Sequence, residues 1–233
     1  METKMVVEND QLKEYREPGY RYQNPVIRFT AKVISYIFHP LFVPVYIIWF
    51  LIESGVYLFA GYSPADKVIF VLRFFVMYTF FPLATILLIK GLGFLDSIYL
   101  KTQKERIIPY IACGIYYFWM CYVLRHQAQH ADKIVQLSMA IFIASSIGLI
   151  ANIYMKISMH AMCMGVLLFF TASLVPVLSS NFTLYMSVVL LIVGLVCTAR
   201  LIVSDHTPAE IYMGLFVGAA SQLLAVWADG ILP

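Results

Sequence analysis

The sequence predicts an all-α protein, a polytopic transmembrane helical bundle of six to seven helices. Hydrophobic residues make up 61% of the 233-residue chain and charged residues 12%, against roughly 45–50% and about 25% in soluble domains. The apolar residues form runs of about 20, the length that crosses a bilayer as a helix. None of these runs alternates as barrel strands do, and unpaired backbone groups are too costly in hydrocarbon for other structures.

Hydropathy predicts seven spans, in order 32–52, 67–90, 107–124, 133–154, 160–178, 183–203 and 207–228. Residues 1–31 are a polar N-terminal tail without the apolar core of a cleavable signal peptide. Residues 32–233 are expected to form one transmembrane domain, because the longest polar stretch between spans, 91–106, is too short for a domain.

The charge and cysteine patterns exclude several functions. The net charge of +3 is modest and the basic residues are scattered or local to loops, so we expect no nucleic-acid partner. The cysteines lie inside apolar runs without metal-type spacing, which is typical of small buried hydrophobes; they are Cys113, Cys121, Cys163 and Cys197.

Ionisable groups at membrane depth are expensive and are usually retained for a site or a pathway. Three polar clusters each precede a hydrophobic span: KTQKERIIP at 101–109, KISMH at 156–160, and ARLIVSDHTPAE at 199–210. Two predicted spans separate the first cluster from the second, and two separate the second from the third. All three clusters are therefore expected on one face of the membrane, where they can converge into a site.

The third cluster contains a helix start and two residues that a helix start does not need. Thr207 is the expected N-cap, Pro208 the first helical residue and Glu210 the capping-box partner. If the chain turns between Arg200 and His206, the histidine lies beside a helix N-terminus that favours an anion. Glu210 can bind one ring nitrogen of His206 and make the other a better nucleophile, so it is interpreted as a cap, a catalytic orienter or both.

The other two clusters offer complementary chemistry. Ser158 is a plausible N-cap whose hydroxyl suits a phosphate oxygen, and His160 in the first turn could act as a general acid. Cations could neutralise the negative charge of a phosphoryl group during its transfer. The basic residues of these clusters are Lys101, Lys104, Arg106 and Lys156. A basic loop flanking a membrane span is the alternative interpretation of the first cluster.

These clusters resemble the type 2 phosphatidic acid phosphatase and vanadium haloperoxidase superfamily, in a membrane lipid phosphatase branch with divergent signatures. The family signatures are K-x6-R-P, P-S-G-H and S-R-x5-H-x3-D. The third matches best, with Arg200, His206 and Glu210 at the right spacing, Ala199 for Ser and Glu for Asp. The second is partial, because ISMH at 157–160 replaces P-S-G-H.

The first signature departs most, because Ile108 stands where its Arg would be and Arg106 lies two positions early. Either Arg106 reaches the phosphate through a shifted helix start, or Lys101 or Lys104 does so. The resemblance covers about residues 100–215 and implies that His206 is the nucleophile, His160 the general acid and Glu210 the orienter. It further implies phosphate ligands, with candidates Arg200, Ser158, Lys101, Lys104, Arg106 and Lys156.

The sequence thus predicts an integral membrane phosphatase that hydrolyses a lipid phosphate or isoprenyl (di)phosphate through a phosphohistidine, with no metal or cofactor. The alternatives are a non-catalytic relative that binds or moves an anionic lipid, and a purely structural membrane protein. We expect a multi-pass protein of the cytoplasmic (inner) membrane of a bacterium, and the oligomeric state, a homo-oligomer included, stays open. The basic tail favours a cytoplasmic site, whereas the resemblance implies the outer face.

Overall fold

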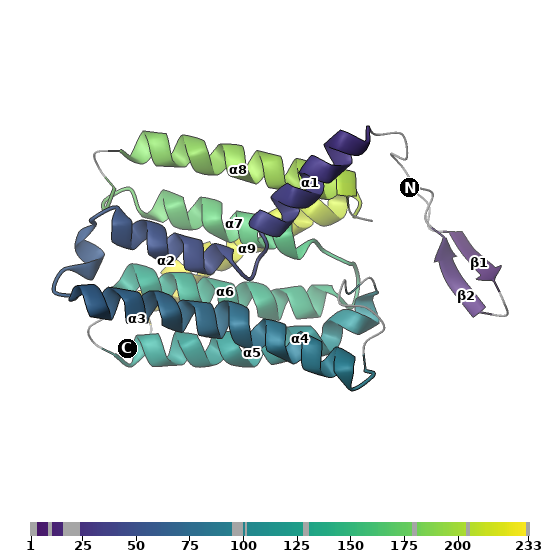
Figure 1. Cartoon of the computed structure of the whole chain (residues 1–233), viewed down its shortest axis with the longest axis horizontal. Helices are drawn as coiled ribbons and strands as arrows, with labels where there is room; N and C mark the ends of the chain where they lie inside the picture. Colours follow the sequence, from purple (N-terminus) through teal and green to yellow (C-terminus); the bar gives the residue numbers. More distant parts are fainter. Residues whose placement is uncertain are drawn as a thin grey trace.

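The computed structural model describes residues 4–8, 11–15, 24–94, 100, 102–127, 131–178, 181–203 and 206–231. Two short strands in the N-terminal tail, β1 (Lys4–Glu8) and β2 (Gln11–Tyr15), form an antiparallel hairpin that the all-α prediction did not include. From Asn24 onward the described residues form helices and their connections (Figure 1). The helical prediction is confirmed for this part of the chain.

The helical elements follow one another in the order α1 (Pro25–Ile37), α2 (Val43–Glu53), η1 (Tyr57–Phe59), α3 (Pro64–Phe75), the π-helical turn η2 (Val76–Phe80), α4 (Phe81–Gly91), α5 (Gln103–Arg125), α6 (Asp132–Ala151), α7 (Met159–Ser173), α8 (Phe182–Val203) and α9 (Pro208–Asp229). Within the described residues, five helical stretches are long and apolar enough to cross a membrane: Pro64–Gly91, α5, α6, α8 and α9. The helices α2 and α7 are apolar but shorter. These helices identify a membrane protein.

The first predicted span, 32–52, is wrong as a single helix. The structure ends α1 at Ile37 and begins α2 at Val43. Pro40 has no backbone N–H and disfavours helical geometry in the residue before it, which breaks the helix here. His39 stabilises the turn, because its Nδ1 atom accepts a hydrogen bond of 3.3 Å from the backbone N–H of Leu41.

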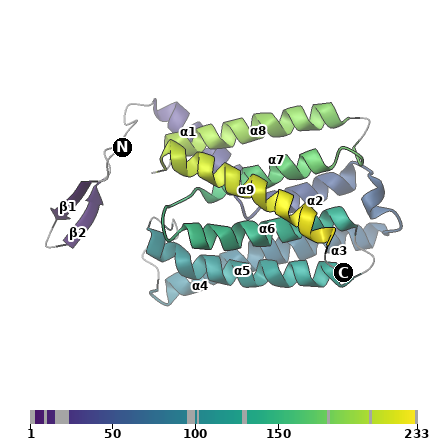
Figure 2. The same cartoon turned by 180° about the vertical axis from the view of Figure 1, so that it is seen from behind.

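The long helices pack as a bundle in which α9 packs against both α6 and α7. Figure 1 shows α8, α7, α6 and α5 in succession, with α2, α3 and α4 in front, and Figure 2 shows α9 crossing the other side. The most extensive packing joins α9 to α7 and to α6, followed by α5 with α6. The starts of α5, α7 and α9 lie at the same end of the bundle (Figure 1).

Helices α7 and α9 approach so closely that their backbones touch. A Cβ atom placed on Gly218 of α9 would lie 1.9 Å from the carbonyl oxygen of Met162 on α7. A Cβ atom on Gly165 of α7 would lie 2.2 Å from the carbonyl oxygen of Leu215 on α9. Small residues allow this approach between membrane helices. The glycines therefore fix the distance between the two helix starts.

Replacing Gly218 with alanine should force α7 and α9 apart, because the contacted atom is backbone and cannot move aside. Overpacking of this kind costs about 2–3 kcal/mol or more, which lowers the midpoint of thermal unfolding by at least about 5 °C. Thermal unfolding in detergent measures the change. Gly194→Ala on α8 is the matched control, because a Cβ atom there meets nothing within 4 Å. Equal midpoints for the two variants would contradict the close contact.

Candidate active site

The start of α9 is built as the sequence predicts. Thr207 is the N-cap and accepts a hydrogen bond from the backbone N–H of Glu210, at 3.3 Å. In return, the backbone N–H of Thr207 donates to Oε2 of Glu210 at 2.9 Å. Pro208 occupies the first helical position. The capping box is confirmed, and it holds the carboxylate of Glu210 at the N-terminus of the helix.

His206 and Glu210 form a buried pair. Nδ1 of His206 lies 3.2 Å from Oε2 of Glu210, and their side chains are 4% and 5% exposed. Because a carboxylate only accepts hydrogen bonds, Nδ1 carries the proton and donates it. Nε2 of the neutral ring is then left with its lone pair. The predicted hydrogen bond is confirmed, and its geometry suits a nucleophilic imidazole.

The surroundings of His206 hold its pKa below the ordinary value of a histidine. The largest cause is burial, which disfavours the charged imidazolium. The hydrogen bond and negative charge of Glu210 raise the pKa, while the positive charges of Arg106 and Arg200 lower it. The net direction is downward, which favours the neutral ring with a lone pair on Nε2.

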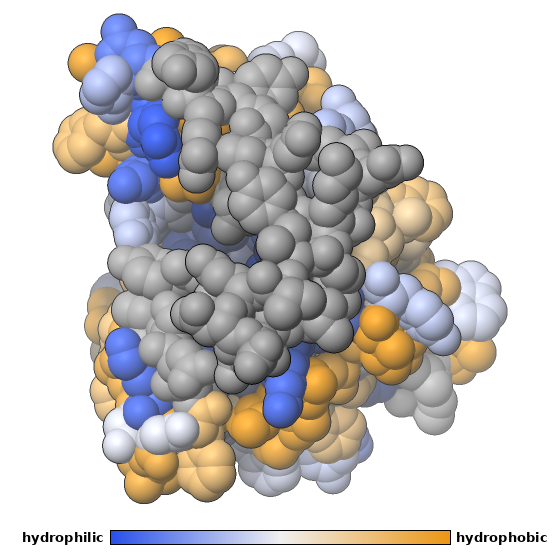
Figure 3. Space-filling view, turned by 90° about the vertical axis from the view of Figure 1, so that its right-hand side faces the viewer, coloured by the Kyte–Doolittle hydropathy of each residue, from blue (hydrophilic) through white to orange (hydrophobic). Residues whose placement is uncertain are grey.

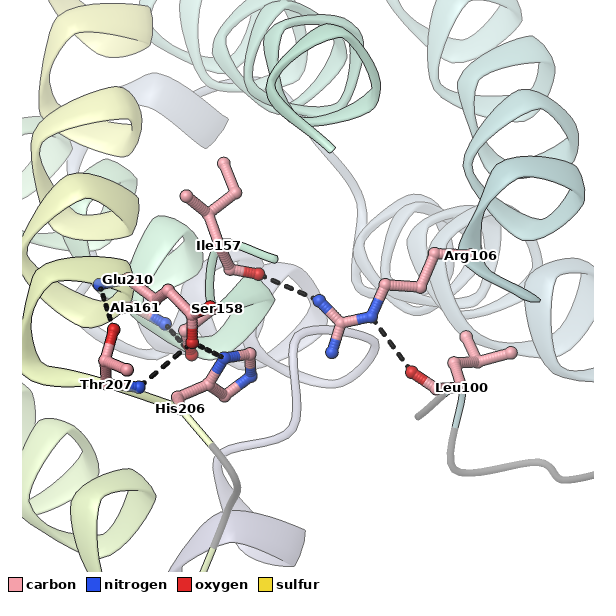
Figure 4. Close-up of polar contacts among 8 residues, drawn as sticks. All are labelled: Leu100, Arg106, Ile157, Ser158, Ala161, His206, Thr207 and Glu210. Atoms are coloured by element: carbon pink, nitrogen blue, oxygen red, sulfur yellow. Dashed lines mark hydrogen bonds and ion pairs between the residues drawn. The ribbon is translucent and has the colours of Figure 1, made fainter. Parts of the chain in front are cut away.

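Arg106 links the first cluster to the second. Its Nε atom donates to the carbonyl oxygen of Leu100 at 2.9 Å, and its Nη1 atom donates to the carbonyl oxygen of Ile157 at 3.0 Å. The residue is 7% exposed. In Figure 4 the guanidinium and the imidazole of His206 point toward each other from opposite sides of the site. Arg106 thus presents a buried positive charge to the imidazole of His206.

Ser158 joins the second cluster to the third. Its backbone N–H donates to the carbonyl oxygen of Glu210 at 3.2 Å, which ties the start of α7 to the start of α9. Its hydroxyl accepts from the backbone N–H of Ala161 at 3.4 Å, so the predicted N-cap is confirmed (Figure 4). The residue is fully buried. The convergence of the three clusters at one end of the bundle is therefore confirmed.

His160 projects from the first turn of α7 as predicted, but it contacts α1. Its Nε2 atom lies 3.1 Å from the carbonyl oxygen of Ser35. Its ring centroid lies 5.1 Å from that of His39, in an edge-to-face arrangement. The structure therefore places the proposed general acid within the cluster, with Nε2 occupied by a backbone carbonyl.

Arg200 lies near the C-terminal end of α8 and is half-buried. Its charge acts on His206, His160 and His39. The chain leaves α8 after Val203 and enters α9 at Pro208. This turn meets the condition under which Arg200 and His206 can belong to one site.

Of the predicted lysines, the structure describes Lys104 and Lys156. Lys101 lies outside the described residues. Lys104 is exposed and stands two positions before Arg106 on α5, which turns it about 200° away on the helix. Lys156 is half-buried in the connection that leads into α7. The structure favours Arg106 over Lys104 as the cation that the first cluster supplies.

Figure 3 looks onto the site end of the bundle, where hydrophilic residues are visible beside apolar residues at the rim.

Among the described residues, no three His, Cys, Asp or Glu side chains group together as metal ligands.

Two features of the site were missed by sequence reasoning. The motif Gly214-x-x-x-Gly218 follows the capping box by one turn, and it signals close helix packing in a membrane. A Cβ atom on Gly214 would lie 2.7 Å from the carbonyl oxygen of Ser158. The approach of His39 to His160 had no local signal, because the two residues are 121 positions apart.

The chain matches no family model, no curated protein and no solved structure.

The titration of His206 tests its surroundings. Histidine-labelled protein in detergent should show a His206 midpoint below about 6.5, the ordinary value of a free histidine. Arg200→Gln removes a positive charge that favours the neutral ring, so it should raise this midpoint. Nuclear magnetic resonance of the ring protons measures both values. A midpoint at or above 6.5 in the unchanged protein would contradict the downward shift that burial and the two arginines produce.

Proposed function

We propose that the chain is an integral membrane phosphatase that hydrolyses a lipid phosphate or isoprenyl (di)phosphate through a phosphohistidine. The observation that carries this proposal is the buried pair of His206 and Glu210, at 3.2 Å, facing Arg106. The pair supplies an oriented neutral nucleophile, and the arginine supplies a fixed positive charge. The resemblance of the spacing from Arg200 to Glu210 supports the same function.

In the first step Nε2 of His206 attacks phosphorus, and the bond from phosphorus to the lipid oxygen breaks. Arg106 and Arg200 stabilise the negative charge on the equatorial oxygens. The leaving oxygen takes a proton, and we assign its donor to His160 in its imidazolium form, which becomes the neutral ring. To donate, the ring exchanges its contact with Ser35 for the leaving oxygen. Glu210 stabilises the positive charge that develops on His206.

In the second step a water molecule attacks the phosphohistidine. The bond between Nε2 of His206 and phosphorus breaks, inorganic phosphate leaves, and the ring returns to its neutral form. His160, now deprotonated, accepts the proton of the attacking water as general base. Each cycle converts one lipid monophosphate and one water into an alcohol and inorganic phosphate. For an isoprenyl diphosphate the bond that breaks is the one to the bridging oxygen, and the products are the isoprenyl monophosphate and inorganic phosphate.

The proposal includes seven helical crossings, with substrate entering from the bilayer between helices. The shorter apolar helices α2 and α7 would complete the five long stretches. A short helix can cross if the bilayer thins locally or if neighbouring segments extend it. We assign the protein to the inner membrane of a bacterium, as the sequence predicts.

A second candidate function is binding of an anionic lipid without turnover. It is favoured by the engagement of Arg106 with two backbone carbonyls and of His160 with a third. Met159 also stands where the family signature has glycine. This candidate would be supported if the purified protein binds a lipid phosphate but hydrolyses no member of a broad panel of phosphate substrates. Orthovanadate should then have no effect on the protein.

His206→Ala should lower phosphate release from phosphatidic acid or farnesyl diphosphate by a factor on the order of a thousand or more, because the nucleophile is lost. Phosphate release from purified protein in mixed micelles measures the effect. His126→Ala is the matched control, because His126 is exposed at the other end of α5 and contacts Tyr122 of its own helix, through the carbonyl oxygen and the ring. Undiminished phosphate release by His206→Ala would contradict the proposed mechanism.

Orthovanadate should inhibit the same reaction, because it mimics the five-coordinate phosphoryl group between His206 and the leaving oxygen. The measurement is phosphate release at increasing orthovanadate with lipid substrate held constant. Inhibition should be competitive with the lipid phosphate. Full activity at millimolar orthovanadate would contradict a covalent phosphohistidine route.

A further inference from the structure

A shallow groove of 310 Å³ runs between α5 and α6, which places it at the lower end of the range for ligand sites, roughly 300–1,000 Å³. Its lining is apolar apart from a tyrosine and two serines. The hydroxyl of Ser146 is turned back to the carbonyl oxygen of Phe142 at 2.9 Å, so it does not make the groove polar. The groove suits a hydrocarbon ligand.

The groove begins beside the candidate active site. Tyr110 lines it and stands one helical turn after Arg106 on α5, which puts the two on the same face of the helix. At the other end, the rings of Phe118 and Phe142 close the groove with centroids 5.5 Å apart. Tyr110 and Phe118 are eight residues apart, or about 12 Å along the axis.

The hydroxyl of Tyr110 is a second indication that the groove binds a ligand. It is buried and has no hydrogen-bond partner among the described residues. It lies against α6, where a Cβ atom on Gly148 would approach it to 3.1 Å. A buried hydroxyl without a partner costs free energy. An oxygen near the polar head of a ligand in the groove would satisfy it.

A second hollow, of 340 Å³ between α3 and α5, has no such relation to the site. Its α5 residues are Trp119, Met120 and Val123, which lie roughly 20–25 Å along the helix from Arg106. Only the groove between α5 and α6, of these two, is continuous with the residues that would hold the phosphate.

We propose that the groove between α5 and α6 binds the hydrocarbon chain of a lipid phosphate whose phosphate lies at Arg106 and His206. This inference rests on the proposed function and names the part of the substrate that the groove recognises. The Tyr110 hydroxyl donates to an oxygen next to the phosphate, and the Phe118 and Phe142 rings limit the length of chain that fits.

Gly114→Leu tests the groove directly. Gly114 lines it, and a Cβ atom there meets nothing within 4 Å, so the leucine fills the groove without displacing the protein. The matched control is Gly194→Leu on α8, where a Cβ atom also meets nothing within 4 Å. Gly114→Leu should lower kcat/KM for dioctanoyl phosphatidate or farnesyl monophosphate at least tenfold, about 1.4 kcal/mol.

The water-soluble p-nitrophenyl phosphate separates the groove from the chemistry, because it has no chain. Its turnover should be unchanged in Gly114→Leu. Full lipid hydrolysis in Gly114→Leu would contradict binding of the hydrocarbon chain in the groove but would leave the proposed phosphatase activity standing. Equal losses in Gly114→Leu and Gly194→Leu overturn it as well. The substrate that loses more in Gly114→Leu, the acyl or the isoprenyl one, identifies the chain.

A photoreactive lipid phosphate tests binding without turnover. With a diazirine at the middle of its chain, it should label α5 and α6 in the His206→Ala protein, and Gly114→Leu should remove most of this label. Labelling without hydrolysis by the unchanged protein would refute the phosphatase while supporting the groove. Labelling of other helices alone would refute the groove.

Two further variants test the ends of the groove. Phe118→Ala opens the closed end, so the preferred chain in a series of alkyl phosphates should become longer. Tyr110→Phe removes a hydroxyl that has no hydrogen-bond partner within the described part of the chain, so it should preserve stability and raise KM several-fold. An unchanged chain preference in Phe118→Ala, or an unchanged KM in Tyr110→Phe, would contradict the assigned role of that end.

Discussion

The backbone contact between α7 and α9 is the constraint on which the site depends. Gly165 and Gly218 let the two helices touch, and the hydrogen bond from Ser158 to the carbonyl oxygen of Glu210 aligns their first turns. This alignment brings a serine cap beside a capping box that already holds a carboxylate. Residues of two clusters that are separated along the chain by α7 and α8 thereby form one buried polar centre. Because bilayer lipid is as apolar as the helix surfaces, close packing and hydrogen bonds have to provide this association.

Burial and charge then select the chemistry. A histidine surrounded by apolar atoms and arginines favours its neutral form, and its carboxylate partner fixes which nitrogen is free. Arg106 is held in place by backbone carbonyls of the connections before α5 and α7, so its charge is positioned before any ligand arrives. Such preorganised charge is the principal means by which a protein stabilises a phosphoryl group in transfer. The groove between α5 and α6 begins one turn away, which lets one molecule occupy an apolar and a charged region together.

Local patterns in the sequence predicted the helix starts and the pairing at His206. Thr207, Pro208 and Glu210 satisfy a capping rule that operates within four residues, and counting spans placed the three clusters at one end. The break at Pro40 was missed because a hydropathy window averages over a single proline. The direction of His160 depends on α1, which lies far away in the sequence. The engagement of Arg106 with backbone carbonyls likewise depends on three-dimensional packing, so the sequence left Arg106 and the lysines as equal alternatives.

The most direct test of the account is to trap the phosphorylated protein. Purified protein is incubated briefly with a lipid phosphate that carries radioactive phosphorus, quenched in base, and digested for mass spectrometry, because a phosphohistidine survives base and is lost in acid. We predict label on the peptide that contains His206, and no label in His206→Ala. Hydrolysis of the lipid phosphate with no label on His206, or with label on another residue, would contradict the central claim.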